Sequence, residues 1–294
     1  MKVNSNISYM AKVKFFTIAA VIISGLTLFF AFKDDLPEVA SQKQPFEQLD
    51  RWELPSQLRE ISGLVWLEDN KLAAVQDEDG IIFIYDLIQR KVVEEIPFGP
   101  SGDYEGIAIS GTTAYVLRSD GAIIEIADYK GSNRKTTTYN TPFSEENNME
   151  TLFFDAVNNQ LLIAPKDSDF KNKGQKGIYA FNLKNNELNT VPIFSIAMTD
   201  AVLKSFVDKD LENTFRPSDL AIHPITGEIY ILEGANPKLM IMDRTGKLKK
   251  VHALPKNQFL QPEGITFSPD GKLYISSEGK KKGKGTITQL RFRH

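Results

Sequence analysis

Short apolar runs alternate with polar turns along the chain from about Gln48 to the C-terminus. The first unit shows the pattern, with strand-like runs at 64–66, 71–75, 81–85 and 91–96. β-branched and aromatic residues dominate such runs, and clusters of Asn, Asp and Gly separate them, which is typical of β-strands joined by tight turns. We therefore expect an all-β domain built from units of four short strands.

A short phrase recurs once in each unit: an acidic residue or its substitute, usually a small residue, and then an apolar strand. The five copies are Ser62-Gly63-Leu64, Glu105-Gly106-Ile107, Glu150-Thr151-Leu152, Asp219-Leu220-Ala221 and Glu263-Gly264-Ile265. Successive copies begin 43, 45, 69 and 44 residues apart. A period of about 40–50 residues that carries several short strands is typical of a β-propeller.

The long interval contains residues 201–211, whose apolar side chains follow a helical spacing. This segment predicts a helix inserted between two blades, because the excess length is too short for a further blade of about 40 residues. The last unit supplies only three strands, and residues 48–54 are expected to add the fourth and so remove the exposed edges. The expected fold is a five-bladed β-propeller, and a six-bladed one is the alternative if the insert is not helical.

The N-terminal region has a different character, because residues 15–32 contain no charged side chain. Eighteen apolar residues are about the minimum needed to cross a hydrocarbon core of ~30 Å. Lys12 and Lys14 precede the run, and Asp34 and Asp35 follow it. The positive-inside rule then places the N-terminus in the cytoplasm and the chain after the run outside it.

A cleaved signal peptide is the alternative interpretation of this run. Signal peptides have shorter apolar regions of about 7–15 residues and end in small residues, whereas this run ends in Phe29-Phe30-Ala31-Phe32. An uncleaved anchor is therefore favoured. The expected organisation is a cytoplasmic N-terminus (1–14), a transmembrane anchor (15–32), a linker (33–47) and a periplasmic β-propeller (48–294), in a single-pass protein of the inner membrane.

Composition excludes several classes of function. The 294 residues include 35 Lys and Arg against 38 Asp and Glu, which gives a net charge of −3 and argues against nucleic-acid binding. The chain has no cysteine, so disulfides, thiol catalysis and thiolate metal sites are excluded.

The recurring acids predict a ring of carboxylates at one end of the propeller axis. The residue that opens each innermost strand and the loop after each second strand are expected at this end, so Asp77, Glu278, Arg118 and Lys166 are also expected near its rim. The candidate metal ligands are Glu105, Glu150, Asp219, Glu263, Glu60, Asp120, Asp167 and Glu233. Carboxylates that lie close together repel one another, and either raised pKa values or a bound cation would relieve the repulsion.

Oxygen donors in this number, with no cysteine and three histidines, favour Ca²⁺, and Mg²⁺ is the alternative. Ca²⁺ takes 6–8 oxygen ligands, which a ring of Asp and Glu with water could supply. A structural role is the other interpretation: each acid could accept hydrogen bonds from backbone amides at the start of a blade. Both interpretations stay open at this point.

The same phrases resemble the SdiA-regulated family of bacterial propeller proteins, over roughly residues 50–293. The matching stretches are LREISGLVW (58–66), DYEGIAI (103–109), NNMETLFFD (147–155), RPSDLAIHPITGEIYIL (216–232) and QPEGITFSPDGKLYISSEG (261–279). The chain is also distantly similar to NHL-type and gluconolactonase-like propellers. The family resemblance implies an exported, often membrane-anchored, five-bladed propeller with calcium among its acids, but it implies no established reaction.

Two functions fit these observations. The first is a calcium-binding module that presents its rim to an unknown ligand or envelope protein and makes no use of catalysis. The second is a metal-dependent hydrolase of the lactonase or phosphodiesterase type, in which the cation activates water and a carboxylate acts as base. The sequence has no G-x-S-x-G elbow and no Gly-rich phosphate loop, so the binding module is favoured.

Overall fold

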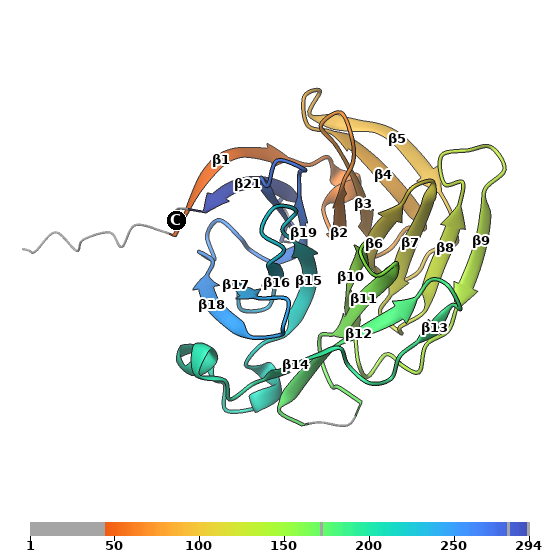
Figure 1. Ribbon diagram of the computed structural model, residues 1–294. Coiled ribbons are helices and arrows are strands. Elements are labelled where there is room, and N and C mark those ends of the chain that lie inside the picture. The colour runs from red at the N-terminus through yellow and green to blue at the C-terminus, as the bar shows by residue number, and fades with distance from the viewer. Residues whose placement is uncertain (1–44, 171–172, 281–282, 293–294) are drawn as a thin grey trace, which may run out of the picture. The chain divides into compact units, whose positions relative to one another are not determined.

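Five antiparallel sheets stand around a common axis in the computed structural model, which describes residues 45–170, 173–280 and 283–292 (Figure 1). The innermost strand of each sheet contacts the innermost strand of the next, and the contacts return from the fifth sheet to the first. The all-β, five-bladed propeller expected from the repeat is therefore confirmed.

In blades 1 to 4 the strands run outward from the axis in chain order, and in blade 5 the outermost strand is β1 from the start of the propeller. Blade 1 holds β2 (Ile61–Trp66), β3 (Lys71–Gln76), β4 (Ile81–Asp86) and β5 (Lys91–Pro97), and blade 2 holds β6 (Tyr104–Ser110), β7 (Thr113–Arg118), β8 (Ile123–Ala127) and β9 (Lys135–Tyr139). Blade 3 holds β10 (Met149–Asp155), β11 (Gln160–Pro165), β12 (Gln175–Asn182) and an outer edge split into β13 (Glu187–Leu188) and β14 (Phe194–Ala197). Blade 4 holds β15 (Pro217–Ile222), β16 (Ile229–Glu233), β17 (Lys238–Met242) and β18 (Leu248–Ala253), and blade 5 holds β19 (Pro262–Phe267), β20 (Leu273–Ser277), β21 (Thr286–Phe292) and β1 (Phe46–Glu53).

The ring closes in blade 5, where β1 from the start of the propeller pairs with β21 from its end. The register runs from Phe46 opposite Phe292 to Glu53 opposite Thr286. This confirms the predicted closing strand, which begins at Phe46, two residues before the predicted start at Gln48. Pairing the first and last strands of the propeller in one sheet covers the edge of β21 that would otherwise be exposed.

The insert between blades 3 and 4 consists of short 3₁₀ turns, so the single helix predicted for 201–211 is wrong. The turns are η2 (Ala201–Phe206) and η3 (Leu211–Asn213), and a third such turn, η1 (Ser56–Leu58), follows β1. Asp200 accepts a hydrogen bond from Val202 N and Asp210 accepts one from Glu212 N, so each aspartate starts a new turn. Aspartate at these positions favours capping over helix continuation, which divides the segment. The insert adds no sixth blade.

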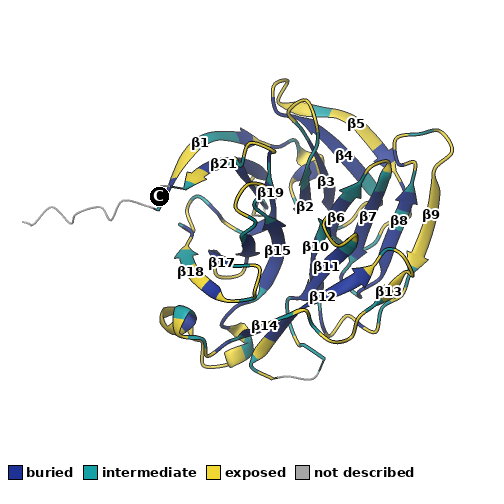
Figure 2. Ribbon diagram, in the orientation of Figure 1, coloured by how far each residue is buried: buried dark blue, intermediate teal, exposed yellow. Residues whose placement is uncertain are grey.

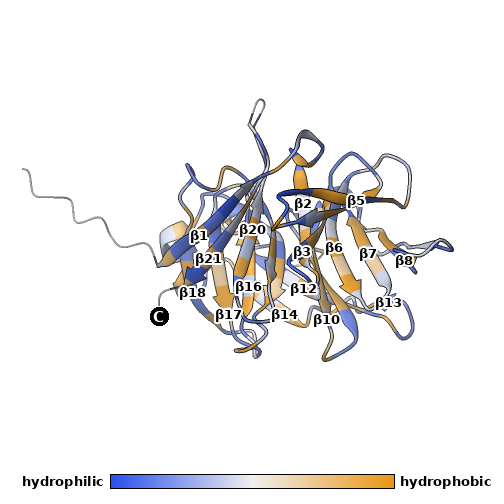
Figure 3. Cartoon of the chain, turned by 90° about the horizontal axis from the view of Figure 1, so that it is seen from above, coloured by the Kyte–Doolittle hydropathy of each residue, from blue (hydrophilic) through white to orange (hydrophobic). Residues whose placement is uncertain are grey.

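The hydrophobic core lies between the blades. Each buried cluster joins two neighbouring blades; one of them packs Val75 and Ile84 of blade 1 against Ile107 and Val116 of blade 2. Burial falls from the inner strands to the outer ones, such as β5 and β9, as Figure 2 shows. Seen from the side, apolar residues follow the inner strands and polar residues the outer edges, such as β1 (Figure 3). A rigid ring of packed inner strands therefore surrounds the axis.

The predicted membrane anchor, residues 15–32, lies outside the described residues, as does most of the predicted linker. Within the part that the structure does describe, no helix has the length and hydropathy needed to span a bilayer.

Candidate site at the axial end of the propeller

A bulge opens the innermost strand of every blade, and it decides which side chains face the axis. In blade 2, Tyr104 lies opposite Arg118 and Gly106 opposite Leu117, so Glu105 is the extra residue. The extra residues in blades 3 and 4 are Glu150 and Ser218. In blades 1 and 5 the bulge places Ser62-Gly63 and Glu263-Gly264 opposite a single residue, so Ser62 and Glu263 take the equivalent positions. A residue in a bulge is unpaired in the ladder, and its side chain is re-aimed.

The register corrects the fourth copy of the recurring phrase. Pro217 lies opposite Glu233 and Asp219 opposite Leu232, so Ser218 is equivalent to Glu105 and Glu150. Asp219 takes the next position, which is Gly63, Gly106 or Gly264 in three other blades. The sequence interpretation placed Asp219 one residue too early, because it aligned the acids rather than the strand register.

The residue after the bulge is small because neighbouring innermost strands nearly touch. A Cβ atom at Gly106 would lie 2.6 Å from Leu152 Cβ in the next blade, and one at Gly264 would lie 2.8 Å from Leu64 Cβ. Such distances are far inside van der Waals contact, so glycine is required at these two positions. The small residue in the repeated phrase is thus a consequence of the narrow five-bladed ring.

Asp219 uses its carboxylate to tie blades together. It accepts hydrogen bonds from Leu220 N at 2.8 Å and from Ile265 N of blade 5 at 2.9 Å, and Leu152 N of blade 3 also donates to it. Burial raises its pKa well above the ordinary value, and these amides oppose the rise. For Asp219 the structural interpretation of the acids describes what is seen: a carboxylate that accepts backbone amides at blade starts.

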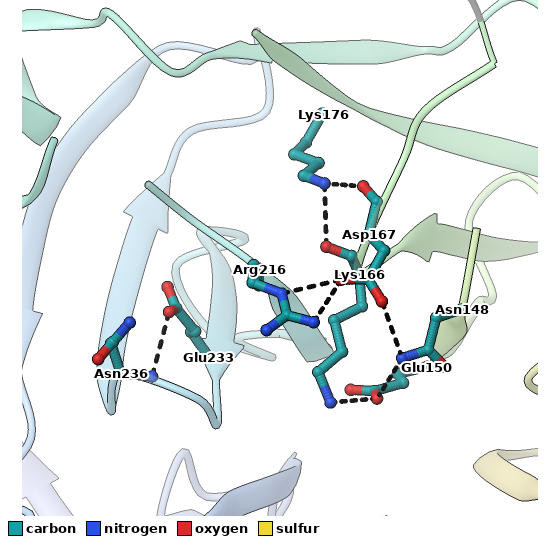
Figure 4. A network of polar contacts seen from close by, with 8 residues as sticks. All are labelled: Asn148, Glu150, Lys166, Asp167, Lys176, Arg216, Glu233 and Asn236. Atoms are coloured by element: carbon teal, nitrogen blue, oxygen red, sulfur yellow. Dashed lines mark hydrogen bonds and ion pairs between the residues drawn. The ribbon is translucent and has the colours of Figure 1, made fainter. Parts of the chain in front are cut away.

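Three glutamates from bulge positions face a single lysine near the axis. Lys166 Nζ donates to Glu150 Oε1 (Figure 4). The charges of Glu263 and Glu105 also act on Lys166 and raise its pKa. Glu150 and Glu263 are 4% and 5% exposed. Among described residues Glu150 Oε2 has no hydrogen-bond partner, although it is buried. We name Glu105, Glu150, Glu263 and Lys166 the axial cluster.

Electrostatics in the axial cluster follow from three carboxyls around one ammonium. Burial lowers the pKa of Lys166, but Glu150, Glu263 and Glu105 together hold it well above its ordinary value. Burial and Asp103 and Glu263 raise the pKa of Glu105 to about 8. Burial and the charge of Glu263 raise the pKa of Glu150, and Lys166 only partly offsets this. The lysine stays charged, and the carboxyls share more protons than isolated ones would.

Lys166 belongs to a loop that is fixed from several sides. Its backbone N–H donates to Asn148 O at 2.9 Å, and buried Lys176 donates from Nζ to the carbonyls of Lys166 and Asp167. Arg216 of blade 4 donates from Nε to Asp167 Oδ1 at 2.9 Å. Together these contacts hold the loop; Figure 4 shows those of Lys176 and Arg216 and the Lys166 side chain directed at Glu150.

Further acids lie outward of the axial cluster at the same end. Burial, together with the charges of Glu263, Asp77 and Glu60, raises the pKa of Glu278 to about 8. Burial and Glu60 raise the pKa of Asp77 to about 6. With Asp103, which acts on both Asp77 and Glu105, these groups extend the negative charge toward solvent. We name Glu60, Asp77, Asp103 and Glu278 the outer acids.

Four of the predicted metal ligands have a basic partner of their own. Glu60 pairs with Arg59 at 3.0 Å, Asp120 with Arg118, Asp167 with Arg216, and Glu233 with Lys238 at 2.5 Å. Arg118 lowers the pKa of Asp120 through their hydrogen bonds. Of the eight predicted ligands, Glu105, Glu150 and Glu263 come together in the axial cluster, whereas Asp219 is directed to backbone amides.

These residues do not fit a calcium ion while Lys166 is in place. The oxygen donors are of the right kind, and the unpartnered Glu150 Oε2 could serve as a ligand. However, the Lys166 ammonium pairs with the other oxygen of Glu150 and lies amid the same glutamates that would bind the metal. Six to eight oxygens around one ion would require this lysine to leave. Calcium binding stays a prediction.

Sequence reasoning expected Lys166 near the rim but did not place it among the axial glutamates, and it did not find the role of Lys176. The residues opposite the strand starts are Gln76, Arg118, Pro165, Glu233 and Ser277, so the next residues, Asp77, Ser119, Lys166, Gly234 and Glu278, are equivalent. Choosing acids after each second strand selected Asp120, Asp167 and Glu233 from positions that do not align. Counting from the end of each second strand would have placed Lys166 in the ring.

Comparison with solved structures supports the fold. A glutaminyl cyclase from Myxococcus xanthus matches with a TM-score of 0.56 at 14% identity, covering 85% of this chain and 97% of that one. A protein of unknown function from Bacteroides thetaiotaomicron matches with a TM-score of 0.50 at 15% identity, covering 83% and 63%. Identities this low show a shared fold alone.

No curated protein matches the sequence. The model of one protein family, described as SdiA-regulated, matches residues 42–280 of this chain. The matched region includes every innermost strand and the whole axial cluster. The chain belongs to the SdiA-regulated family.

Proposed function

We propose that this protein is a binding module whose acidic axial end receives a cationic group of a ligand or envelope protein. The observation that carries the proposal is the imbalance of charge at that end. The axial cluster and the outer acids contribute seven carboxyls, and the basic groups that act on them are Lys166, Arg59 and Arg216. Glu105 and Glu278, whose pKa values are about 8, hold protons at pH 7 that a bound cation would displace. Clefts lined by one sign of charge attract ligands of the opposite sign.

The chemistry of the ligand follows from the group already seated there. A primary ammonium, that of Lys166, lies among Glu150, Glu263 and Glu105, so the glutamates are arranged to suit an ammonium. The outer acids Asp77 and Glu278 offer the same type of acceptor closer to solvent. An amine or guanidinium, such as a basic side chain of an envelope protein, therefore fits the outer acids best.

The location of the module rests on the sequence. The uncharged run at 15–32, with lysines before it and aspartates after it, supports a single-pass anchor in the inner membrane with the propeller outside the cytoplasm. A propeller held there would present its axial end to periplasmic partners.

The experiment is a binding titration of full-length protein with an oligolysine peptide, with oligoglutamate as the control peptide. Binding of oligolysine is expected at low salt and should weaken at least tenfold at 0.5 M NaCl because exposed charges are screened. A variant with Asp77→Asn and Glu278→Gln should lose most of the binding. Asp270→Asn is the matched control, since Asp270 lies in the β19–β20 turn and is paired with Lys272. No difference between the two peptides would contradict the proposal.

One observation favours the hydrolase as a second candidate. Glu105 is a half-buried carboxyl whose pKa is raised to about 8, and it lies near the cationic Lys166. A carboxyl with a pKa near neutrality can act as a general acid or base. Turnover of lactones or phosphodiesters that is lost in Glu105→Gln and retained in Asp270→Asn would support hydrolysis over binding.

A further inference from the structure

We propose that the Lys166 ammonium is the resident counter-ion of the axial glutamates and occupies the place that a divalent cation would take in a ring of carboxylates. The inference goes beyond the proposed function, because it concerns the inner glutamates and holds whatever ligand the outer acids receive.

The first argument is the position of the ammonium. Lys166 Nζ contacts Glu150 Oε1, and the charges of Glu150, Glu263 and Glu105 all act on it. The lysine side chain is 14% exposed and that of Glu150 is 5% exposed. Ion pairs screened by bulk water contribute little, but an ammonium enclosed with carboxylates interacts strongly with them.

The second argument is that the lysine is held by parts unrelated to the charge pairing. Lys176, 1% exposed, donates to the carbonyl oxygens of Lys166, at 2.9 Å, and of Asp167. Asn148 O accepts the Lys166 N–H at 2.9 Å, and Arg216 fixes Asp167 from blade 4. The two carbonyl acceptors partly offset the desolvation of the buried Lys176 ammonium, which lowers its pKa, and they fix the loop from which the Lys166 side chain extends. Lys176 is therefore a positioning residue for Lys166.

The third argument is the unpartnered Glu150 Oε2. One ammonium cannot satisfy three carboxyls, so an oxygen that a metal would bind is left over. Removing the ammonium should add Glu150 Oε1 to the free oxygens and remove the positive charge that opposes a metal ion. Among the described residues, no group of three acidic or histidine side chains is placed to hold a metal ion. With the ammonium gone, the same glutamates should be able to move together and form a calcium site that the native chain does not offer.

The test is a thermal melt of full-length protein with calcium alone as the probe, in the native chain and in Lys166→Met. In the native chain 5 mM Ca²⁺ is expected to raise the Tm by less than 1 °C. In Lys166→Met it is expected to raise the Tm by about 5 °C, the size that follows from a site of about 0.1 mM affinity. Lys166→Arg keeps the charge and should respond like the native chain.

Two results would overturn the proposal. One is a native Tm that rises several degrees with Ca²⁺ and loses this response in Glu150→Gln, because calcium would then bind with Lys166 present. The other is a folded Lys166→Met protein that ignores Ca²⁺. If Lys166→Met does not fold, the response of the native chain to Ca²⁺ still tests the proposal. Neither result depends on oligolysine binding, so this inference and the proposed function can fail separately.

Discussion

Two buried lysine–glutamate pairs in this propeller differ in how many carboxyls surround the lysine. Glu233, at the end of β16, pairs with Lys238, the first residue of β17, and both are nearly inaccessible. Glu233 Oε1 also accepts Asn236 N, and Lys238 Nζ also donates to Asn236 O and lies 5.8 Å from the centres of the Phe206 and Phe215 rings. One cation thus faces one carboxylate in a closed site.

The Glu150–Lys166 pair lies in an unbalanced site. Lys166 faces Glu263 and Glu105 as well as Glu150. Among the described residues neither Glu150 Oε2 nor Glu233 Oε2 accepts a hydrogen bond, but Glu233 Oε2 contacts the Lys238 ammonium, whereas Lys166 contacts the other oxygen of Glu150. A balanced, enclosed pair has nothing left to offer a ligand, whereas an excess of carboxyls invites protons or cations. The difference supports a structural role for Glu233 and Lys238 and the proposal that the axial end binds a ligand.

The largest expected effect is at the balanced pair. Lys238→Met should lower the free energy of unfolding by about 3–5 kcal/mol at pH 7, because it leaves Glu233 charged and buried without a partner. Denaturant unfolding measures the loss. The double variant with Glu233→Gln removes both charges and should recover most of it; a double variant no more stable than Lys238→Met would contradict the comparison.

A smaller effect is expected at Asp219. Asp219→Asn should lower the free energy of unfolding by about 2–3 kcal/mol, because an amide group replaces one of the oxygens that accept from Leu220 N and Ile265 N. Ser218→Ala is the matched control at the adjacent position, where the hydroxyl donates to Pro262 O at 3.1 Å. It should cost less than Asp219→Asn in the same denaturant series, and the reverse order would remove Asp219 from its role between blades.

The smallest expected effect is a pH dependence from the unbalanced site. Glu105 and Glu278 have pKa values raised to about 8, and Asp77 to about 6, so the folded protein binds more protons than the unfolded chain between pH 5 and 8. Stability should therefore fall as the pH rises through this window, by about 1–2 kcal/mol after allowance for solvent screening.

Denaturant unfolding at pH 5, 6.5 and 8 checks the direction. A double variant with Glu105→Gln and Glu278→Gln should show a flatter profile, whereas Asp120→Asn should not, because Arg118 lowers the pKa of Asp120. If the stability of the native protein rose from pH 5 to 8, basic groups would have to hold the pKa values of these carboxyls below their unfolded values, which would contradict the prediction.

Much of the fold could be predicted because strands and turns are local features. The alternation of apolar runs and turns gave the five blades, and the missing strand of the last unit identified the closing strand near Gln48. The structure of the insert was harder to predict, because the apolar spacing at 201–211 suits one helix whereas Asp200 and Asp210 cap separate 3₁₀ turns.

The site was only partly predictable because it depends on register. Glu105, Glu150 and Glu263 each precede a small residue and were among the predicted ligands. In blade 4, however, Asp219 was assigned to the bulge position that Ser218 occupies. Lys166 was predicted near the rim. Its actual place among the glutamates depends on a loop held by Lys176 and Arg216, and no pattern in the sequence joins those distant residues.

The most direct test of the unbalanced axial end is an experimental structure of the full-length protein, crystallised with 5 mM Ca²⁺. The account predicts that the Lys166 ammonium lies against Glu150 with Glu263 and Glu105 around it, and that no metal ion lies between these glutamates. A calcium ion bound by Glu105, Glu150 and Glu263, with the Lys166 side chain turned away, would contradict it.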